Sequence, residues 1–177
     1  MKTNKLLTSA VLALFAVLPA PVDASSVKNT VGFTVGSTTG LGLTYRASYN
    51  NWFGQLAMMP LWNKEDGGRV FSGTQFGKRI QGDDSFYLNV AFGTGVMYAQ
   101  GEDCTWTEGE DDDHSGSRVC EDYEDVYLAG GPSVGLGKVW GEHFHGEIYL
   151  PIAAVWKVGS GLDAVVPYPG ATFGYRW

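Results

Sequence analysis

The sequence lacks a long apolar run anywhere beyond its first residues. The apolar core from Leu6 to Leu18 is too short for a membrane-spanning helix, which needs roughly 20 apolar residues. No later stretch comes closer. Apolar and polar residues alternate there instead, a pattern typical of strands with one apolar face. If this chain crosses a membrane, it must do so with strands.

Cysteine is absent from the N-terminal region, which otherwise has the features of an export signal. Lys2 and Lys5 precede the apolar core, and Val22-Asp23-Ala24 forms a small-residue cleavage site. We therefore predict a signal peptide over residues 1–24 and one mature domain over residues 25–177. Without a cysteine at the cleavage site, no lipid attachment is expected there.

Basic residues are almost missing from one segment. Between Glu102 and Asp125, eleven acidic residues stand against one base, Arg118. Such a local charge argues against nucleic acid as a partner. The two cysteines of the chain, Cys104 and Cys120, lie in this segment. In an exported protein they predict a disulfide that closes a loop and stabilises it by about 3 kcal/mol; two free thiols are the alternative.

Alternation between apolar and polar residues predicts eight strands, which the mature length can hold at ~10 residues each. The expected ranges are 28–37, 41–49, 52–62, 69–80, 85–99, 123–139, 144–158 and 164–177. The 25 glycines fit a narrow barrel interior, where little room remains for side chains. The expected fold is all-β: an eight-stranded antiparallel up-and-down transmembrane β-barrel with short periplasmic turns and one long acidic extracellular loop, 100–122.

Aromatic residues flank the predicted spans. Trp52 and Trp62 are ten residues apart, about the length that a tilted strand needs to cross an apolar band of ~25 Å. Phe173, Tyr175 and Trp177 share one face of the last strand, and Trp and Tyr favour membrane–water boundaries. A soluble lipocalin-like barrel would turn its apolar faces inward around a ligand. That alternative does not explain the polar residues on the opposite faces of these strands.

The polar residues on those opposite faces are expected to fill the lumen. Buried guanidinium groups beside a single carboxylate need hydrogen bonds to be tolerated. The expected network consists of Arg46, Arg79, Asn89, Glu147 and Arg176. A packed polar plug is the predicted arrangement, and a conducting pore is the alternative.

The signal peptide, the mature length, the alternating strands and the terminal segment Gly170–Trp177 resemble small outer-membrane barrels of the OmpX/Ail and OmpA transmembrane-domain type. The last strands of that group often end in Gly-x-Gly-Tyr-Arg-Phe, and Trp177 stands here where Phe is usual. The resemblance covers the mature chain as architecture and only the final strand as motif.

This resemblance implies a location in the bacterial outer membrane, among outer-membrane lipid and lipopolysaccharide. It also implies that Phe173, Tyr175 and Trp177 resemble the signal read by the barrel-insertion machinery during assembly. Members of the group act as adhesion and serum-resistance factors or as structural proteins.

A nucleophile is missing where an enzyme of similar size would need it. Alternation places His143, His145 and Glu147 on one strand face, and lipid A deacylases of the PagL type are similar in size and strand number. That family uses a His-x-Ser pair with an acidic partner, whereas His145 and Glu147 hold the corresponding positions here. A PagP-like acyltransferase would need His and Ser in outer loops, and adjacent His114 and Ser115 do not by themselves form a triad. No catalytic activity and no cofactor are expected.

Ordered metal-ligand spacing is absent as well. The acidic run carries hard oxygen ligands but not the spacing and glycine of an EF-hand loop. We therefore expect only weak Ca²⁺ or Mg²⁺ binding, at Glu108, Glu110, Asp111, Asp112 and Asp113. The pattern His143-x-His145-x-Glu147 has no identifiable further ligand, so no metal centre is expected there.

These features predict an integral outer-membrane protein with a structural or surface-interaction role, in the manner of an adhesion or resistance factor. The loop 100–122 is the expected site for an extracellular partner, with Trp106 as its apolar contact. A small channel is the alternative, and a lipid A-modifying enzyme is a weaker one.

Overall fold

The computed structural model describes residues 27–63, 67–83, 85–107 and 117–177, and the predicted signal peptide lies outside them. The described residues form strands and turns, and they contain no helix long and apolar enough to cross a membrane. The strands are β1 (Val27–Gly36), β2 (Gly40–Tyr49), β3 (Trp52–Asn63), β4 (Gly67–Gly82), β5 (Tyr87–Thr107), β6 (Ser117–Trp140), β7 (Phe144–Lys157), β8 (Gly161–Pro167) and β9 (Gly170–Arg176).

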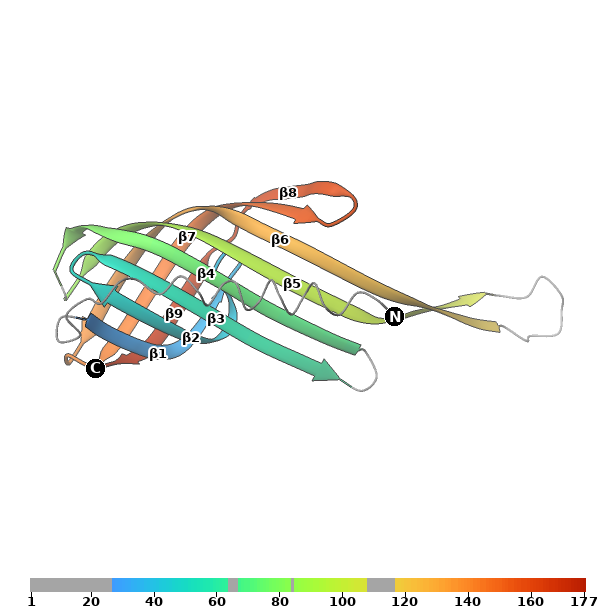
Figure 1. Cartoon of the computed structure of the whole chain (residues 1–177), viewed down its shortest axis with the longest axis horizontal. Helices are drawn as coiled ribbons and strands as arrows, with labels where there is room; N and C mark the ends of the chain where they lie inside the picture. Colours follow the sequence, from blue (N-terminus) through green and yellow to red (C-terminus); the bar gives the residue numbers. More distant parts are fainter. Residues whose placement is uncertain (1–26, 64–66, 84, 108–116) are drawn as a thin grey trace.

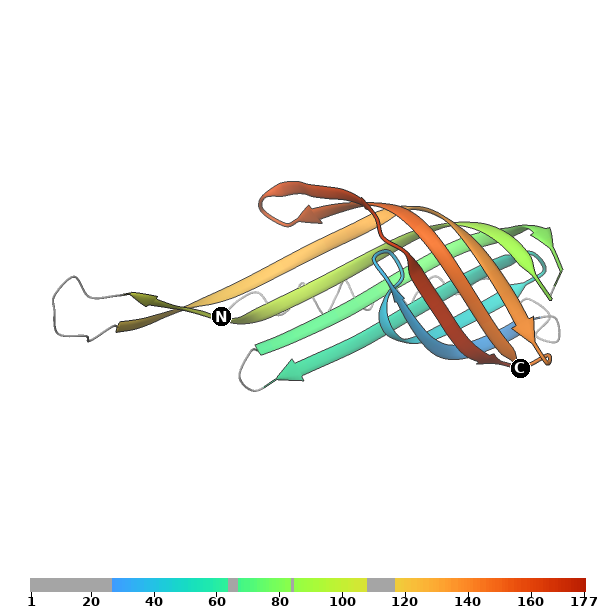
Figure 2. The ribbon, with the colours of Figure 1, turned by 180° about the vertical axis from the view of Figure 1, so that it is seen from behind.

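The strands form the closed barrel that the sequence predicts. Each pairs antiparallel with its neighbours along the chain from β1 to β7. β9 then pairs with both β7 and β1, from Thr30 opposite Arg176 to Val35 opposite Ala171, and this pairing closes the sheet. Figures 1 and 2 show the resulting up-and-down barrel from its two sides. The all-β, eight-stranded antiparallel fold is confirmed.

β8 and β9 together make the eighth strand. Both pair with β7, and Tyr168 and Pro169 separate them. The strand was predicted to run unbroken over 164–177, so this interruption corrects the prediction. Only β9 reaches β1, which leaves β8 paired on one side among the described strands. Pro167 and Pro169 suit such an edge because proline has no N–H to donate to a ladder.

The two faces of the barrel wall have opposite polarity. Apolar side chains point outward, with Leu43 of β2 73% exposed and Ile148 of β7 69% exposed. Residues one position away point inward, as Thr44 and Glu147 do, and are buried. The buried polar set is Thr30, Thr34, Thr38, Thr39, Thr44, Arg46, Gln55, Gln75, Asn89, Ser133, His145, Glu147 and Thr172. The lipocalin-like alternative, with an apolar interior, is therefore wrong.

Three tight turns lie at one end of the barrel, together with the C-terminal end of β9. They join β2 to β3, β4 to β5 and β6 to β7, and we call this end the inner mouth. In the second turn, Asp83 Oδ1 accepts hydrogen bonds from the Ser85 hydroxyl at 2.6 Å and from the Ser85 and Phe86 backbone N–H groups at 2.8 and 3.2 Å. The hydroxyl bond, with help from the backbone bonds, lowers the pKa of Asp83.

The acidic segment differs from the predicted loop. β5 continues to Thr107 and β6 begins at Ser117, so their pairing extends to Thr107 opposite Ser117. A loop over 100–122 is therefore replaced, in the described residues, by a two-stranded ribbon that extends beyond the barrel (Figure 1). Acidic side chains interrupt the apolar pattern used to locate strands, yet backbone pairing does not require an apolar face. We call the paired residues 101–107 and 117–123 the acidic ribbon.

The turn between β1 and β2 lies inside the barrel. Thr38 and Thr39 are buried, and the Thr39 hydroxyl hydrogen-bonds with the Tyr149 hydroxyl of β7. Gly73 of β4 lies against this turn: a Cβ there would overlap the backbone of Thr39 and Gly40. The sequence predicts a short connection here but not its inward position, because that position depends on glycines on strands across the lumen.

We predict that Gly73→Val destabilises the barrel because the valine side chain would displace this turn from the lumen. Overpacking of this kind costs about 1–3 kcal/mol. The control is Gly54→Val on β3, where an added Cβ meets no atom within 4 Å. Urea unfolding of the folded barrel, followed by tryptophan fluorescence, measures both variants. Equal stability of the two variants would contradict tight packing at the turn.

Candidate functional site

Strand register brings the basic residues of the inner mouth together. Thr30 on β1 lies opposite Arg46 of β2 on one side and Arg176 of β9 on the other. Arg79 of β4 lies opposite Asn89 of β5. All of these point inward, with Arg46 and Asn89 buried and Arg79 and Arg176 partly exposed. The structure thus gathers the residues predicted for the lumen network.

A buried ion pair lies at the centre of this network. Arg46 Nη1 donates to Glu147 Oε2 at 2.6 Å, and their side chains are only 5% and 1% exposed. The Tyr87 hydroxyl also donates to Glu147 Oε2, at 3.1 Å. The Arg46 guanidinium lies 3.6 Å from the centre of the Phe53 ring. Charge-assisted hydrogen bonds of this type are stronger than neutral ones, so Glu147 holds Arg46 and Tyr87 in place.

His145 joins the network through Tyr87. The Nε2 atom of His145 hydrogen-bonds with the Tyr87 hydroxyl, and the two rings stack with centres 6.1 Å apart. Gly137 of β6 makes room for Tyr87, because a side chain at Gly137 would overlap the tyrosine ring. The spacing of His145 and Glu147, two residues apart on β7, indicated in the sequence that both side chains share one face. Nothing in the sequence indicated that Gly137 would lie against Tyr87.

His143 does not share this site, which corrects the single face predicted for His143, His145 and Glu147. β7 begins at Phe144, so His143 lies in the preceding turn and is exposed. Its ring stacks on Tyr175 with centres 5.3 Å apart. Strand alternation cannot be extended across a turn, and this is the reason for the difference.

Neutral polar side chains fill the lumen above the ion pair. Thr34 on β1 hydrogen-bonds with Thr172 on β9 at 2.7 Å and with the Tyr149 hydroxyl at 3.2 Å. Gln55 Nε2 lies 3.3 Å from the Thr172 hydroxyl oxygen. Together with the inward turn, these contacts leave the lumen occupied by side chains from several strands.

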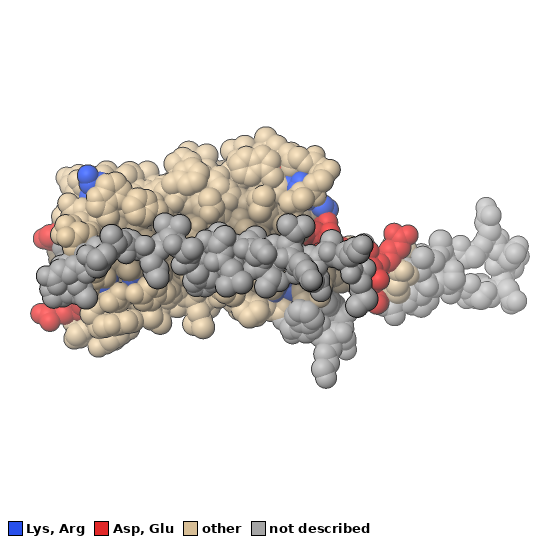
Figure 3. All heavy atoms as spheres, viewed as in Figure 1, with Lys and Arg blue, Asp and Glu red and all other residues tan. Residues whose placement is uncertain are grey.

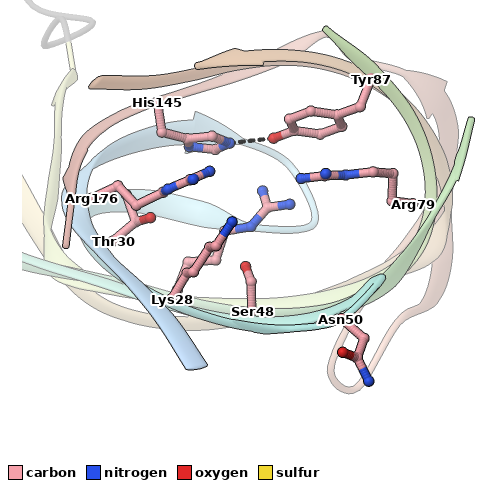
Figure 4. Close-up of a pocket in the computed structure, with 9 residues that line it drawn as sticks. Lys28, Thr30, Ser48, Asn50, Arg79, Tyr87, His145 and Arg176 are labelled. Carbon is pink, nitrogen blue, oxygen red and sulfur yellow. Dashed lines mark hydrogen bonds between the residues drawn. The ribbon is translucent and has the colours of Figure 1, made fainter. Parts of the chain in front are cut away.

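A cavity of about 200 Å³ lies at the inner mouth, below the ion pair. Figure 4 shows most of its labelled side chains pointing inward from the surrounding strands, with Asn50 at the rim pointing away. The lining consists of Lys28, Thr30, Arg46, Ser48, Asn50, Arg79, Tyr87, His145 and Arg176. Four of these side chains are basic and none is acidic.

This arrangement does not form the nucleophile–base pair of a hydrolase. The hydrogen bond of the His145 ring goes to a tyrosine hydroxyl, which in turn donates to Glu147. Acyl transfer of the PagL or PagP type would require a serine hydroxyl next to the imidazole. What the site offers instead is positive charge at a solvent-facing cavity.

The disulfide is confirmed. Cys104 of β5 and Cys120 of β6 lie directly opposite each other in the register and are bonded. Within the described residues, the grouping with metal-ligand proximity is Glu102 with these two cysteines, and the bond leaves no thiolate to bind a metal. The predicted weak cation ligands, Glu108, Glu110, Asp111, Asp112 and Asp113, lie outside the described residues, as do His114 and Ser115.

The aromatic residues of the last strand point outward. Phe173, Tyr175 and Trp177 are each about half exposed, whereas Thr172 and Gly174, on the opposite face of the strand, are buried. Phe173 also stacks on Phe144 of β7, with ring centres 6.2 Å apart. The predicted aromatic face is thus present on the outer wall next to the inner mouth.

Comparison of the chain with protein-family models, with curated proteins and with solved structures finds no match. The resemblance to the OmpX/Ail and OmpA group therefore stays an expectation from the sequence.

We predict that Glu147→Ala lowers the free energy of unfolding by about 3–5 kcal/mol, because Arg46 would stay buried without its carboxylate. The control is Asp125→Ala, which removes the partner of Lys157 in a more exposed pair with a 2.9 Å contact. Asp125→Ala should lower the free energy of unfolding by no more than about 1 kcal/mol. Urea unfolding measures the free energy of unfolding of both variants. Similar losses for the two variants would contradict the dominant role of the buried pair.

Proposed function

We propose that this chain is an integral outer-membrane β-barrel protein of a bacterium, with a structural or surface-interaction role and no catalytic activity. The observation that carries the proposal is the polarity of the wall, which is apolar outside and polar inside. A soluble protein would expose such a surface to water at a high cost, whereas lipid would cover it.

The outer wall supports membrane insertion over most of the barrel height. In Figure 3 the visible wall shows few charges, and Lys, Arg, Asp and Glu side chains gather toward its two ends. Exposed aromatic side chains flank the inner-mouth turns, as Trp and Tyr do at membrane–water boundaries. They are Tyr49, Trp52, Phe86, Trp140, Phe144, Tyr175 and Trp177.

In this arrangement the inner mouth faces the periplasm and the acidic ribbon faces the outside of the cell. Short turns on the periplasmic side are the rule for bacterial barrels. Phe173, Tyr175 and Trp177 then face lipid, where the barrel-insertion machinery could read them during assembly. Lipopolysaccharide would surround the base of the acidic ribbon.

The acidic ribbon is the part of the molecule best placed for a surface role. β5 has 21 residues and β6 has 24, whereas a tilted strand needs only about 9–11 residues to span the membrane. Glu102, Glu121 and Asp122 are exposed on the projecting part. The disulfide holds its two strands in register, which an isolated hairpin could not maintain by itself. An acidic projection with a disulfide between its strands suits a partner with a basic surface.

We predict that the disulfide-bonded acidic ribbon is exposed on the cell surface. A membrane-impermeant maleimide should label intact cells only after treatment with an impermeant reductant, because Cys104 and Cys120 are oxidised until then. The control is Asn51→Cys, at an inner-mouth turn, in a chain without the native cysteines; it should react only after lysis. Labelling of the native cysteines before reduction, or only after lysis, would contradict the prediction.

The surface role predicts that cells lose adhesion when the acidic ribbon is removed. Gly101 and Tyr123 lie opposite each other, so residues 102–122 can be replaced by an Asn-Gly hairpin turn without changing the barrel register. The shortened chain should insert normally but reduce adhesion of intact cells to immobilised basic proteins. A full-length variant that combines Glu102→Gln, Glu121→Gln and Asp122→Asn keeps the length of the ribbon but removes three negative charges. Its adhesion shows whether charge or length is responsible for the effect.

Unchanged adhesion of cells carrying the shortened chain would contradict the surface role. Planar-bilayer recording of the unaltered protein tests the channel alternative. Because side chains fill the lumen, we expect low conductance; large and stable single-channel currents would favour the channel instead.

A further inference from the structure

The cavity at the inner mouth concentrates positive charge from separate strands. Lys28 comes from β1, Arg46 from β2, Arg79 from β4 and Arg176 from β9. The described lining residues include no carboxylate, and Glu147, which is bonded to Arg46, does not line the cavity. The lining is therefore strongly cationic.

Two of these basic groups, Arg46 and Arg79, are held in position by neighbouring side chains. Glu147 fixes Arg46, which is 4% exposed. The Arg79 guanidinium lies 4.2 Å from the centre of the Tyr87 ring. Lys28 and Arg176 also take part in interactions. A side chain that is already held in place loses little entropy when it binds a ligand.

The directions of the side chains indicate the shape of the ligand. Figure 4 shows Arg79 and Arg176 reaching toward the cavity from opposite walls, with Lys28 between them. Thr30 and Ser48 add hydroxyl groups to the lining, and hydroxyls can donate hydrogen bonds. Donors that approach from several sides match a tetrahedral oxyanion, whereas a planar carboxylate is best bound along one edge by one guanidinium.

The charge and size of the cavity narrow the ligand class further. A multivalent anion is attracted to several basic groups at once, so the cationic lining favours it over a monovalent anion. A cavity of about 200 Å³ holds several waters, each with a share of about 30 Å³ in the liquid. It has room for a small group such as phosphate or pyrophosphate.

We propose that the inner-mouth cavity is a binding site for a phosphate group. Arg79, Arg176 and Lys28 contact its oxygens, and Thr30 and Ser48 donate hydroxyl hydrogen bonds to it. The group is supplied either by a soluble phosphate or by a phosphorylated headgroup. This site is independent of the acidic ribbon and of its proposed surface role.

The test uses the purified mature protein in a non-ionic detergent and isothermal titration calorimetry with pyrophosphate, inorganic phosphate and glycerol phosphate at constant ionic strength. We expect saturable binding of one ligand per barrel. Arg79→Gln should weaken it at least about tenfold, as expected for the loss of one charged hydrogen bond. Tighter binding of glycerol phosphate than of inorganic phosphate would identify a headgroup as the source, and the reverse a soluble anion.

The matched control is Lys78→Gln. Lys78 precedes Arg79 on β4 but is exposed on the outer wall, with Nζ 5.2 Å from the centre of the Trp52 ring. The Lys78→Gln substitution removes one positive charge, as Arg79→Gln does, and should leave the affinity for phosphate unchanged. Lys28→Gln provides a second test, because Lys28 is exposed and its replacement should not disturb folding.

Three results would overturn the proposal. The first is a lack of saturable binding to the wild-type protein. The second is equal weakening by Lys78→Gln and Arg79→Gln, which would indicate a non-specific effect of net charge. The third is unchanged affinity in the variant that combines Lys28→Gln with Arg79→Gln.

Discussion

The pairing of β1 with β9 is the constraint on which the rest of the structure depends. It closes the sheet, so that the backbone N–H and C=O groups of these two strands hydrogen-bond with each other and no sheet edge is left unpaired between them. Closure also gives every strand residue one of only two directions, into the lumen or out of the wall. The inward side chains must then pack together in the narrow lumen, and the outward side chains are all exposed to the same environment outside the barrel.

A narrow lumen explains which inward residues are large and which are glycine. Tyr87 and Tyr149 are each fully buried, and each lies against glycines that leave space for its ring, Gly137 for Tyr87 and Gly170 for Tyr149. The inward turn between β1 and β2 uses Gly73 in the same way. Large polar groups and glycines thus complement one another across the lumen, and Arg46 and Glu147 can be buried because they neutralise each other.

Period-two alternation was sufficient to predict the strand number, the closed antiparallel fold and the face of most residues. Asn89 illustrates this, since the alternation of β5 assigns it to the lumen, where it is buried. The prediction failed where pairing continues without an apolar face, as in the acidic ribbon. The predicted face of His143 was also wrong, because this residue lies in a turn, where strand alternation does not apply. The predicted last strand is interrupted at Tyr168 and Pro169.

Contacts between distant strands could not be predicted from the sequence. The bond between His145 and Tyr87 and the position of Thr39 against Gly73 depend on which residues meet across the lumen, and alternation gives only the face. The cysteine pair was the exception, because the sequence has only two cysteines and each therefore has one possible intramolecular partner. The bonded cysteines lie directly opposite each other on β5 and β6, which is consistent with the paired strands of the acidic ribbon in place of the predicted open loop.

The lining of the inner-mouth cavity and the acidic ribbon differ in the sign of their charge. The inner mouth gathers basic side chains, and the acidic ribbon carries exposed carboxylates at the opposite end. Screening reduces interactions over more than about 10 Å at 0.1 M salt, so each end acts on its own surroundings. An anion attracted to the inner mouth would be repelled by the ribbon, and a basic partner of the ribbon would be repelled by the mouth. The two proposed sites therefore have opposite charge preferences and lie apart, so that each can be altered without changing the other.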